Sequence, residues 1–403
     1  MAKGLTLKVM MLGGRRAGKT STLAAMQGCF DKVFRDTVLN IIPEGGTTLE
    51  AIEKKQAEIK RYVDGAEQNL MFVPDHNPSS EDQIYRFLLK MQSQKKHDAI
   101  HLEFYDYPGE YLIGNHPEYD KIEKHIEESD VLMIILDTPY LMEEDGIYNV
   151  TRNRCDRITS AIKTNFVLQS SVPKMVLFVP IKCEKYYDEN RIDEVFSKVE
   201  SCYEDLIFYL RGHCEMAVTP IFTLGTAVFA GFDYDESSGE TIMSKELDGE
   251  ILPSKPLYRF SPKAKEAAKR QGLAKSYTAE PKYCEQPAVY TIYYALTFAS
   301  NVAIIMEMKR KQDKKGLKKL FFNPKFSVMV LSFLKTAIPS PLWGIVKPET
   351  LGKMVEALQQ RYDFPSAEDF LQQRDIVYKR MKRSGDGYYV LEPDIMKFKG
   401  DAT

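Results

Sequence analysis

The stretch Gly13-Gly14-Arg15-Arg16-Ala17-Gly18-Lys19-Thr20 decides the fold, and it follows the apolar run LTLKVMML at residues 5–12. It matches the pattern G-x-x-x-x-G-K-[ST], in which glycines let backbone N–H groups wrap around phosphate oxygens. Residues from Lys19 onward suit a helix, and the N-terminus of a helix attracts anions. The stretch, extended by Ser21, therefore predicts a phosphate-binding loop between a strand and a helix. Lys19 is expected to bridge the β- and γ-phosphates, and Thr20 to ligate Mg²⁺.

A second motif, Asp106-Tyr107-Pro108-Gly109-Glu110, directly follows the strand-like segment HLEFY at residues 101–105. A carboxylate at the end of a neighbouring strand can hold Mg²⁺ through a water molecule, which is the role expected of Asp106. The N–H group of Gly109 would contact the γ-phosphate. Glu110 occupies the position where many GTPases keep a water-orienting glutamine. It would orient water or act as a base there, or it would be a solvated charge of the switch loop. For the motif as a whole, the alternative is a surface Pro-Gly turn.

A third, degenerate motif indicates which base is bound. Ile181-Lys182-Cys183-Glu184 follows KMVLFVP, where GTPases usually have N-K-x-D. The stem of Lys182 would pack on the base, and the Glu184 carboxylate would accept hydrogen bonds from guanine N1 and N2 while repelling the acceptor edge of adenine. Ile181 replaces the usual Asn, so a charged turn at the end of a strand remains the alternative. Gly225 and Thr226 fall where a small-residue loop would lie near the base.

Two further sets of residues are candidates for the phosphate side of the site. Thr47 and Thr48, in PEGGTT, would supply a switch threonine that closes on Mg²⁺ and the γ-phosphate, or would form a turn or cap the next helix. Arg16 stands three residues before Lys19, a spacing that resembles the internal arginine finger of large dimerising GTPases. The spacing predicts hydrolysis that rises when two G domains meet as a homodimer. The alternative is that Arg15 and Arg16 face solvent or pair with an acid.

Apolar runs of strand length alternate with helical patterns through the first 230 residues. Strands are predicted at 5–12, 84–91, 99–105, 130–137, 174–181 and 218–224, and helices at 49–63, 118–128, 152–168 and 191–210. This alternation predicts an α/β fold, a three-layer P-loop NTPase sandwich of the G-domain type with a mostly parallel sheet. The hairpin at 84–105 would add one antiparallel edge strand.

The expected domain boundaries follow from the point at which strands and helices stop alternating regularly. We expect a P-loop GTPase domain at 1–230, an insertion of loops and short strands at 231–285, and the last helix of the G domain at 286–312. A basic, apolar and partly helical extension would cover 313–403, with helical pattern at 349–383. The segment 309–335 would make a weak contact with an anionic membrane, or would pack on the G domain while its lysines remain solvated.

The composition restricts the partners. The 403 residues carry a net charge of −2, which gives no overall attraction to nucleic acid, and no nucleic-acid partner is expected. The six cysteines have no paired spacing, which favours free thiols in a reducing compartment. We find no signal peptide and no long apolar stretch, so a cytoplasmic location is expected.

The segments GGRRAGKT, DYPGEY, IKCE and CEQP (284–287) resemble the TRAFAC-class double-GTPase families of bacteria, including stress-associated P-loop proteins with a DYPGE-type motif. The resemblance implies a G domain, binding of GTP or GDP with Mg²⁺, slow hydrolysis, and a link to stress or conflict responses. The leading hypothesis is a regulatory GTPase switch acting on an unknown protein effector. An ATPase or phosphotransferase and a non-hydrolysing nucleotide-binding scaffold are the alternatives.

Overall fold

The computed structural model describes residues 5–35, 37–67, 82–91, 100–112, 116–166, 174–211, 213–225, 229–244, 255–260, 266, 269–272, 277–310, 366–380 and 389–392. Its main sheet has eight strands in the order β12-β7-β6-β5-β1-β4-β3-β2. The strands are β1 Thr6–Leu12, β2 Leu39–Pro43, β3 Gln83–Met91, β4 Ile100–Asp106, β5 Val131–Asp137, β6 Lys174–Ile181, β7 Cys214–Val218 and β12 Tyr389–Glu392. The five strands from β7 to β4 are parallel, and the outer strands pair antiparallel. Both β5 and β6 are buried along their whole length, as expected of central parallel strands.

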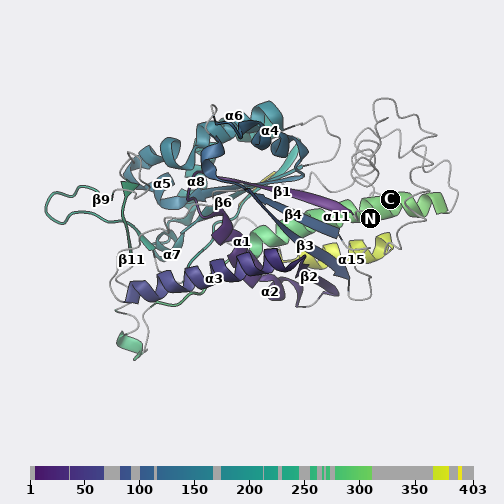
Figure 1. Cartoon of the computed structure of the whole chain (residues 1–403), viewed down its shortest axis with the longest axis horizontal. Helices are drawn as coiled ribbons and strands as arrows, with labels where there is room; N and C mark the ends of the chain where they lie inside the picture. The colour runs from purple at the N-terminus through teal and green to yellow at the C-terminus, as the bar shows by residue number, and fades with distance from the viewer. Residues whose placement is uncertain are drawn as a thin grey trace.

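Helices cover both faces of this sheet (Figure 1). On one face lie α1 Lys19–Gly28, α2 Phe30–Phe34, α3 Gly46–Glu67, α11 Glu285–Arg310 and α15 Ala367–Tyr378. On the other lie α4 Tyr119–Glu128, α6 Cys155–Asn165, α8 Ile192–Cys202 and α9 Glu204–Leu210. Two short helices, α5 Thr138–Met142 and α7 Glu184–Asp188, follow β5 and β6 directly. The arrangement is a three-layer α/β sandwich of the G-domain type, as predicted.

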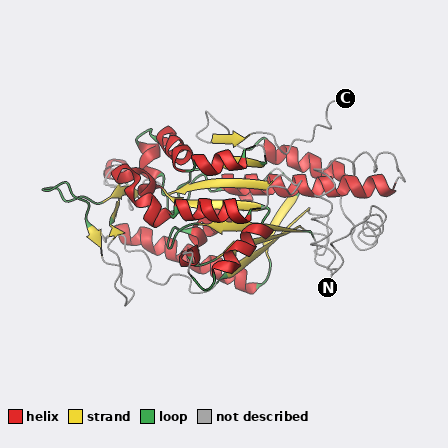
Figure 2. Ribbon diagram, turned by 90° about the horizontal axis from the view of Figure 1, so that it is seen from above, coloured by secondary structure: helices red, strands yellow, loops and turns green. Residues whose placement is uncertain are grey.

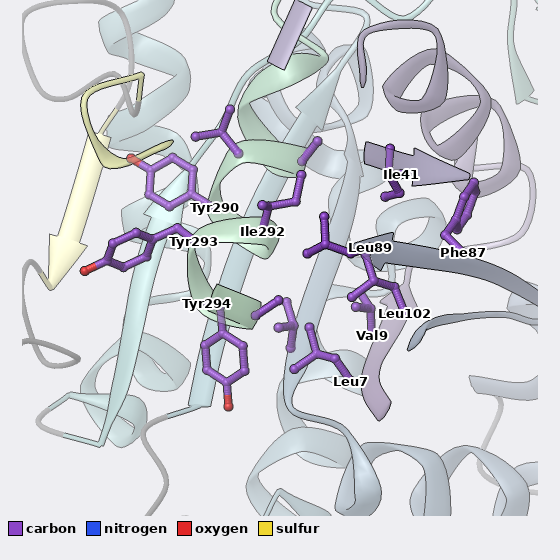
Figure 3. Packing of buried hydrophobic residues seen from close by; sticks show 14 of the residues in the cluster. Leu7, Val9, Ile41, Phe87, Leu89, Leu102, Tyr290, Ile292, Tyr293 and Tyr294 are labelled. Carbon is purple, nitrogen blue, oxygen red and sulfur yellow. The ribbon is translucent and has the colours of Figure 1, made fainter. Parts of the chain in front are cut away.

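The first face is packed chiefly by the long helix α11. Its residues Tyr290, Ile292, Tyr293 and Tyr294 are at most 3% exposed, and they belong to the same hydrophobic core as the strand residues Leu7 and Val9 (Figure 3). Helix α15 packs beside α11 on this face, and Figure 2 shows the two helices running side by side. Residues from the end of the chain therefore stabilise the nucleotide-binding fold at its beginning.

The region after β7 forms two small two-stranded sheets, one pairing β8 Phe229–Phe232 with β11 Tyr258–Phe260, the other β9 Met243–Ser244 with β10 Lys255–Pro256. A separate hydrophobic core joins this insertion to the body of the protein. Tyr258 and Phe232 pack there with Tyr140 of α5 and with Ile59 and Val63 of α3. The insertion is thus docked on elements that surround the predicted nucleotide site.

Several predicted elements need correction. The hairpin of β3 and β4 is present, but β3 is not the edge strand, because β2 pairs antiparallel with its outer side. The strand predicted at 218–224 is β7, which ends at Val218, and the run predicted as one helix at 191–210 is broken at Tyr203 into α8 and α9.

Other predictions lie partly beyond the described residues. Of the helical pattern at 349–383, the part that the structure describes forms α15, and nearly all of 309–335 is outside the described residues. Among the residues that the structure does describe, no helix is long and apolar enough to span a membrane, and all six cysteines are free thiols.

Candidate nucleotide-binding site

The predicted phosphate loop connects β1 to α1. Gly18 precedes the first helical residue with φ of 86°, a left-handed conformation that favours glycine. Lys19 is 6% exposed, and its Nζ donates to the carbonyl oxygens of Gly13 and Gly14 at 3.2 and 3.3 Å. Burial lowers the pKa of Lys19, while the nearby carboxylates of Asp106 and Glu110 act in the opposite direction. The ammonium group is therefore held at the loop by acceptors that a phosphate could supplement.

The end of β4 brings Asp106 to the start of α1. The Thr20 hydroxyl donates a hydrogen bond to Oδ2 of Asp106. Asp106 is 3% exposed, and its other oxygen, Oδ1, has no hydrogen-bond partner among the described residues. Burial raises the pKa of this carboxyl, and the charge of Lys19 partly offsets that effect. A hydroxyl and a carboxylate with a spare oxygen are the hard oxygen ligands that Mg²⁺ prefers, so the residues present fit that ion.

Two glycines allow the loops of the site to touch. A β-carbon on Gly109 would lie 2.2 Å from the backbone nitrogen of Arg15, and one on Gly14 would lie 1.9 Å from the carbonyl oxygen of Arg152. Gly109 begins the short helix η2 Gly109–Leu112, and Arg152 belongs to the π-helical turn η4 Asn149–Asn153. The phosphate loop is therefore in direct backbone contact with both segments, at distances that only glycine permits.

The remaining phosphate-side candidates are placed as follows. Glu110 lies near enough to Lys19 to affect its pKa, and its Oε2 is buried without a hydrogen-bond partner among the described residues. Arg15 is exposed, whereas Arg16 is partly buried and has φ of 59°. Ala17 is buried, and Ser21 follows Thr20 in the first turn of α1.

The candidate switch threonines lie at the start of α3. Thr47 is exposed, and Thr48 is buried with its hydroxyl accepting a hydrogen bond from the backbone N–H of Arg86 at 3.2 Å. Farther along the same helix, the charge of Lys55 helps to lower the pKa of Asp106. The structure thus brings α3 to the predicted Mg²⁺ side of the site through Lys55, a residue that the sequence patterns had not singled out.

On the predicted base side, Lys182 is paired with an acid that sequence reasoning missed. Lys182 Nζ forms a buried salt bridge with Oδ2 of Asp137, the last residue of β5. The hydroxyl of Tyr258 donates to the same oxygen at 2.8 Å, and the Tyr258 ring lies 4.2 Å from Lys182 Nζ. An acid at the carboxyl end of an apolar strand was a usable signal for Asp137, but nothing local marks Tyr258.

Glu184 is fully buried at the start of α7. Desolvation raises its pKa to about 8, although Lys182 and the backbone N–H groups of Leu224 and Gly225 act to lower it. Neither carboxylate oxygen has a hydrogen-bond partner of standard geometry among the described residues. The carboxylate therefore faces the loop at 224–225.

The insertion covers this loop. A β-carbon on Gly225, whose φ is 147°, would lie 2.1 Å from the carbonyl oxygen of Thr278. The sequence alone did not predict that residues from the insertion would reach the base side. Thr226, the other candidate in the loop, lies outside the described residues.

Fold and site together define a P-loop protein of the G-domain class. The sequence matches the family model Double-GTPase 2 over residues 8–236, which is more than half of the chain, and the chain belongs to that family. No curated protein matches it. Membership supports GTP binding and suggests a GTPase.

Solved structures give weaker likenesses. The GTPase-like domain of Ski7 from S. cerevisiae, bound to GTP, has a TM-score of 0.34 at 12% identity over 62% of this chain and 48% of that chain. The cytosolic domain of the FeoB iron transporter from T. maritima has a TM-score of 0.21 at 10% identity, with 93% and 99% covered. The chain thus spans about half the length of the Ski7 structure, and the sheet order and family match carry the fold assignment.

Proposed function

We propose that this protein binds GTP with Mg²⁺, hydrolyses it slowly, and acts as a regulatory switch for a protein effector. The observation that carries the proposal is the junction of the phosphate loop with the DYPGE motif. There the Lys19 ammonium, the bonded pair of Thr20 and Asp106, and the close contact of Gly109 with Arg15 converge. This junction supports a site in which a terminal phosphate would contact several loops at once.

In this proposal each group of residues has a separate chemical role. Lys19 and the backbone N–H groups of residues 13–20 bind the phosphates, and Thr20 and Asp106 hold Mg²⁺, which would neutralise phosphate charge. Glu110 positions the attacking water beside Gly109. Slow hydrolysis is consistent with a glutamate in place of the usual glutamine, because the negative charge of the carboxylate disfavours attack of water on an anionic phosphate.

Base recognition is assigned to the loop of Lys182 and Glu184, with Asp137 as the partner of Lys182. The buried acceptor oxygens of Glu184 have no hydrogen-bond partner of standard geometry among the described residues, and guanine presents N–H donors at both N1 and N2. An adenine ring would present an acceptor at the matching edge. This supports guanine over adenine as the base.

Calorimetry with GDP, GTP and ATP in Mg²⁺ tests the proposal. Lys19→Ala should weaken GTP and GDP binding by at least about 10-fold, because it removes a charged hydrogen-bond donor worth about 1.5–3 kcal/mol. Thr20→Ala should retain more affinity and lose much of its Mg²⁺ dependence. The control Lys163→Ala removes a partly exposed lysine on α6 and should bind as the wild type does. Undiminished binding by Lys19→Ala, or equal binding of ATP and GTP by the wild type, would contradict the proposal.

A further inference from the structure

Three arginines lie close together where η4 runs into α6. Arg152 is in η4, Arg154 immediately precedes α6 with φ of 61°, and Arg157 is in the first turn of α6. Arg152 and Arg154 both contact the phosphate loop. A β-carbon on Gly14 would lie 1.9 Å from the Arg152 carbonyl oxygen and 3.6 Å from Cγ of Arg154. The stem of Arg154 is therefore packed on the backbone of the predicted phosphate cradle.

The charge of Arg154 is not balanced within the described part of the chain. No carboxylate there forms an ion pair with its guanidinium, and no hydrogen bond to it is formed by a described residue. Partial burial lowers the pKa of Arg154, and the positive charges of Arg152 and Arg157 lower it further. A partly desolvated guanidinium between two like charges raises the free energy of the protein without nucleotide, unless an anion binds beside it.

We propose that Arg154 is a second cation on the phosphate chain of the bound nucleotide, supplied by the segment between β5 and α6. This inference rests on the proposed nucleotide binding and adds a residue that no motif assigns. The packing of its stem on Gly14 places the base of the Arg154 side chain against the predicted phosphate loop. From there the guanidinium would reach the terminal phosphates, so the contact should strengthen with each added phosphate.

A phosphate fits this site better than a carboxylate of the protein itself. Arginine binds phosphate through a planar fork of N–H donors, and such charge-assisted pairs are the stronger hydrogen bonds of proteins. The neighbouring acid of the site, Glu110, is not among the groups that perturb Arg154. The surplus of positive charge therefore suits a multiply charged anion that enters from solution.

The test compares Arg154→Gln with the wild type by calorimetry on guanosine, GDP and GTP. Loss of the guanidinium should reduce GTP affinity about 10- to 100-fold, reduce GDP affinity less, and leave guanosine binding unchanged. Arg154→Lys should recover only part of the loss, because an ammonium lacks the planar fork. Arg157→Gln is the matched control: it removes a like charge of the same cluster from an exposed position and should bind all three ligands nearly as the wild type does.

Thermal unfolding without nucleotide separates this role from a structural one. Removing an unbalanced charge should leave the midpoint of Arg154→Gln unchanged or slightly higher. An equal loss of affinity for guanosine, GDP and GTP, or a lowered midpoint that accounts for the loss, would overturn the proposal. Unchanged GTP affinity in Arg154→Gln would also overturn it, and the proposed GTP binding by the wild type would stand in either case.

Discussion

Glu184 is the residue to which the proposed function assigns recognition of the base. It has a fully buried carboxylate, and its pKa is raised to about 8 because desolvation penalises the charged form. In the proposed site, the ionised form would accept hydrogen bonds from guanine N1 and N2. Binding of a guanine nucleotide near neutral pH should therefore require the loss of a proton from Glu184.

This linkage predicts a pH dependence of nucleotide affinity. GDP affinity should rise as pH increases from 6 to 8, by up to about tenfold per pH unit, and level off above the pKa. Glu184→Gln cannot ionise, so it should bind more weakly at pH 8 and lack this part of the slope. Calorimetry on both proteins across this pH range is the test, because the titration of the nucleotide phosphates is common to both and cancels in the difference between them. Parallel pH profiles for the two proteins would show that Glu184 does not read the base.

The same shift affects stability without nucleotide. The pKa of Glu184 in the folded protein lies above its ordinary value of 4.5. Its contribution to the free energy of unfolding is therefore fully present below pH 4.5 and is lost as pH rises toward 8. Urea unfolding of the nucleotide-free protein should show this decline between pH 5 and 8. Glu184→Gln should flatten it, which gives a second readout that does not depend on binding.

Among the elements, α15 shows how a segment distant in sequence is fixed on the fold. Its N-terminus carries a capping box: the Ser366 hydroxyl accepts from the backbone N–H of Asp369, and the Asp369 carboxylate accepts from the backbone N–H of Ser366. Phe370 and Val377 are at most 2% exposed in the core shared with α11. The cap satisfies backbone groups that the helix leaves open, and the apolar face attaches the helix to the sheet.

Ser366→Ala should destabilise α15 by about 0.5–2 kcal/mol, because it removes the cap acceptor from an exposed position. Hydrogen exchange of the amides of α15 should quicken, while the amides of β5 and β6 retain their protection. Gln372→Ala, at an exposed position on the same helix, is the control and should change little. Equal exchange in Ser366→Ala and the wild type would show that packing alone holds this helix.

At the scale of the whole molecule, we predict that catalysis depends on a second copy of the chain. Arg16 lies in the phosphate loop with a left-handed backbone and a partly buried side chain, while its neighbour Arg15 is exposed. An arginine placed on a terminal phosphate offsets charge that develops in transfer and can be worth roughly 10³–10⁵ in rate. We expect contact between two G domains to place the Arg16 guanidinium at that position.

Single-turnover GTP hydrolysis across a range of protein concentrations tests this prediction. The wild-type rate should rise with concentration, and Arg16→Ala should lose most of that rate with nearly unchanged GTP affinity. Arg16→Lys should rescue poorly, and Arg15→Ala is the adjacent control. Wild-type rates for both Arg16 variants at every concentration would exclude Arg16 as a catalytic residue.

The sequence by itself determined the parts of this protein that depend on short spacing. The phosphate loop, the hairpin that leads to Asp106, and the central strands were predictable, because glycine spacing and apolar runs act through neighbouring residues. The family resemblance rested on the same local motifs, and the family match over residues 8–236 confirms it. The order of the parallel strands then follows from the G-domain fold.

Only the tertiary structure decided what lies around those motifs. Tyr258 reaches Asp137 across 121 positions in the chain, and Arg152 meets Gly14 from a different loop. The edge strand β2 was missed as well, because its five residues carry too weak a pattern to be distinguished from a loop. Such contacts depend on how the insertion and the connecting turns pack on the sheet. Packing between distant segments produces no periodic pattern of apolar residues in the sequence. For that reason the loops of the site were predictable from sequence, and the residues that surround and adjust them were not.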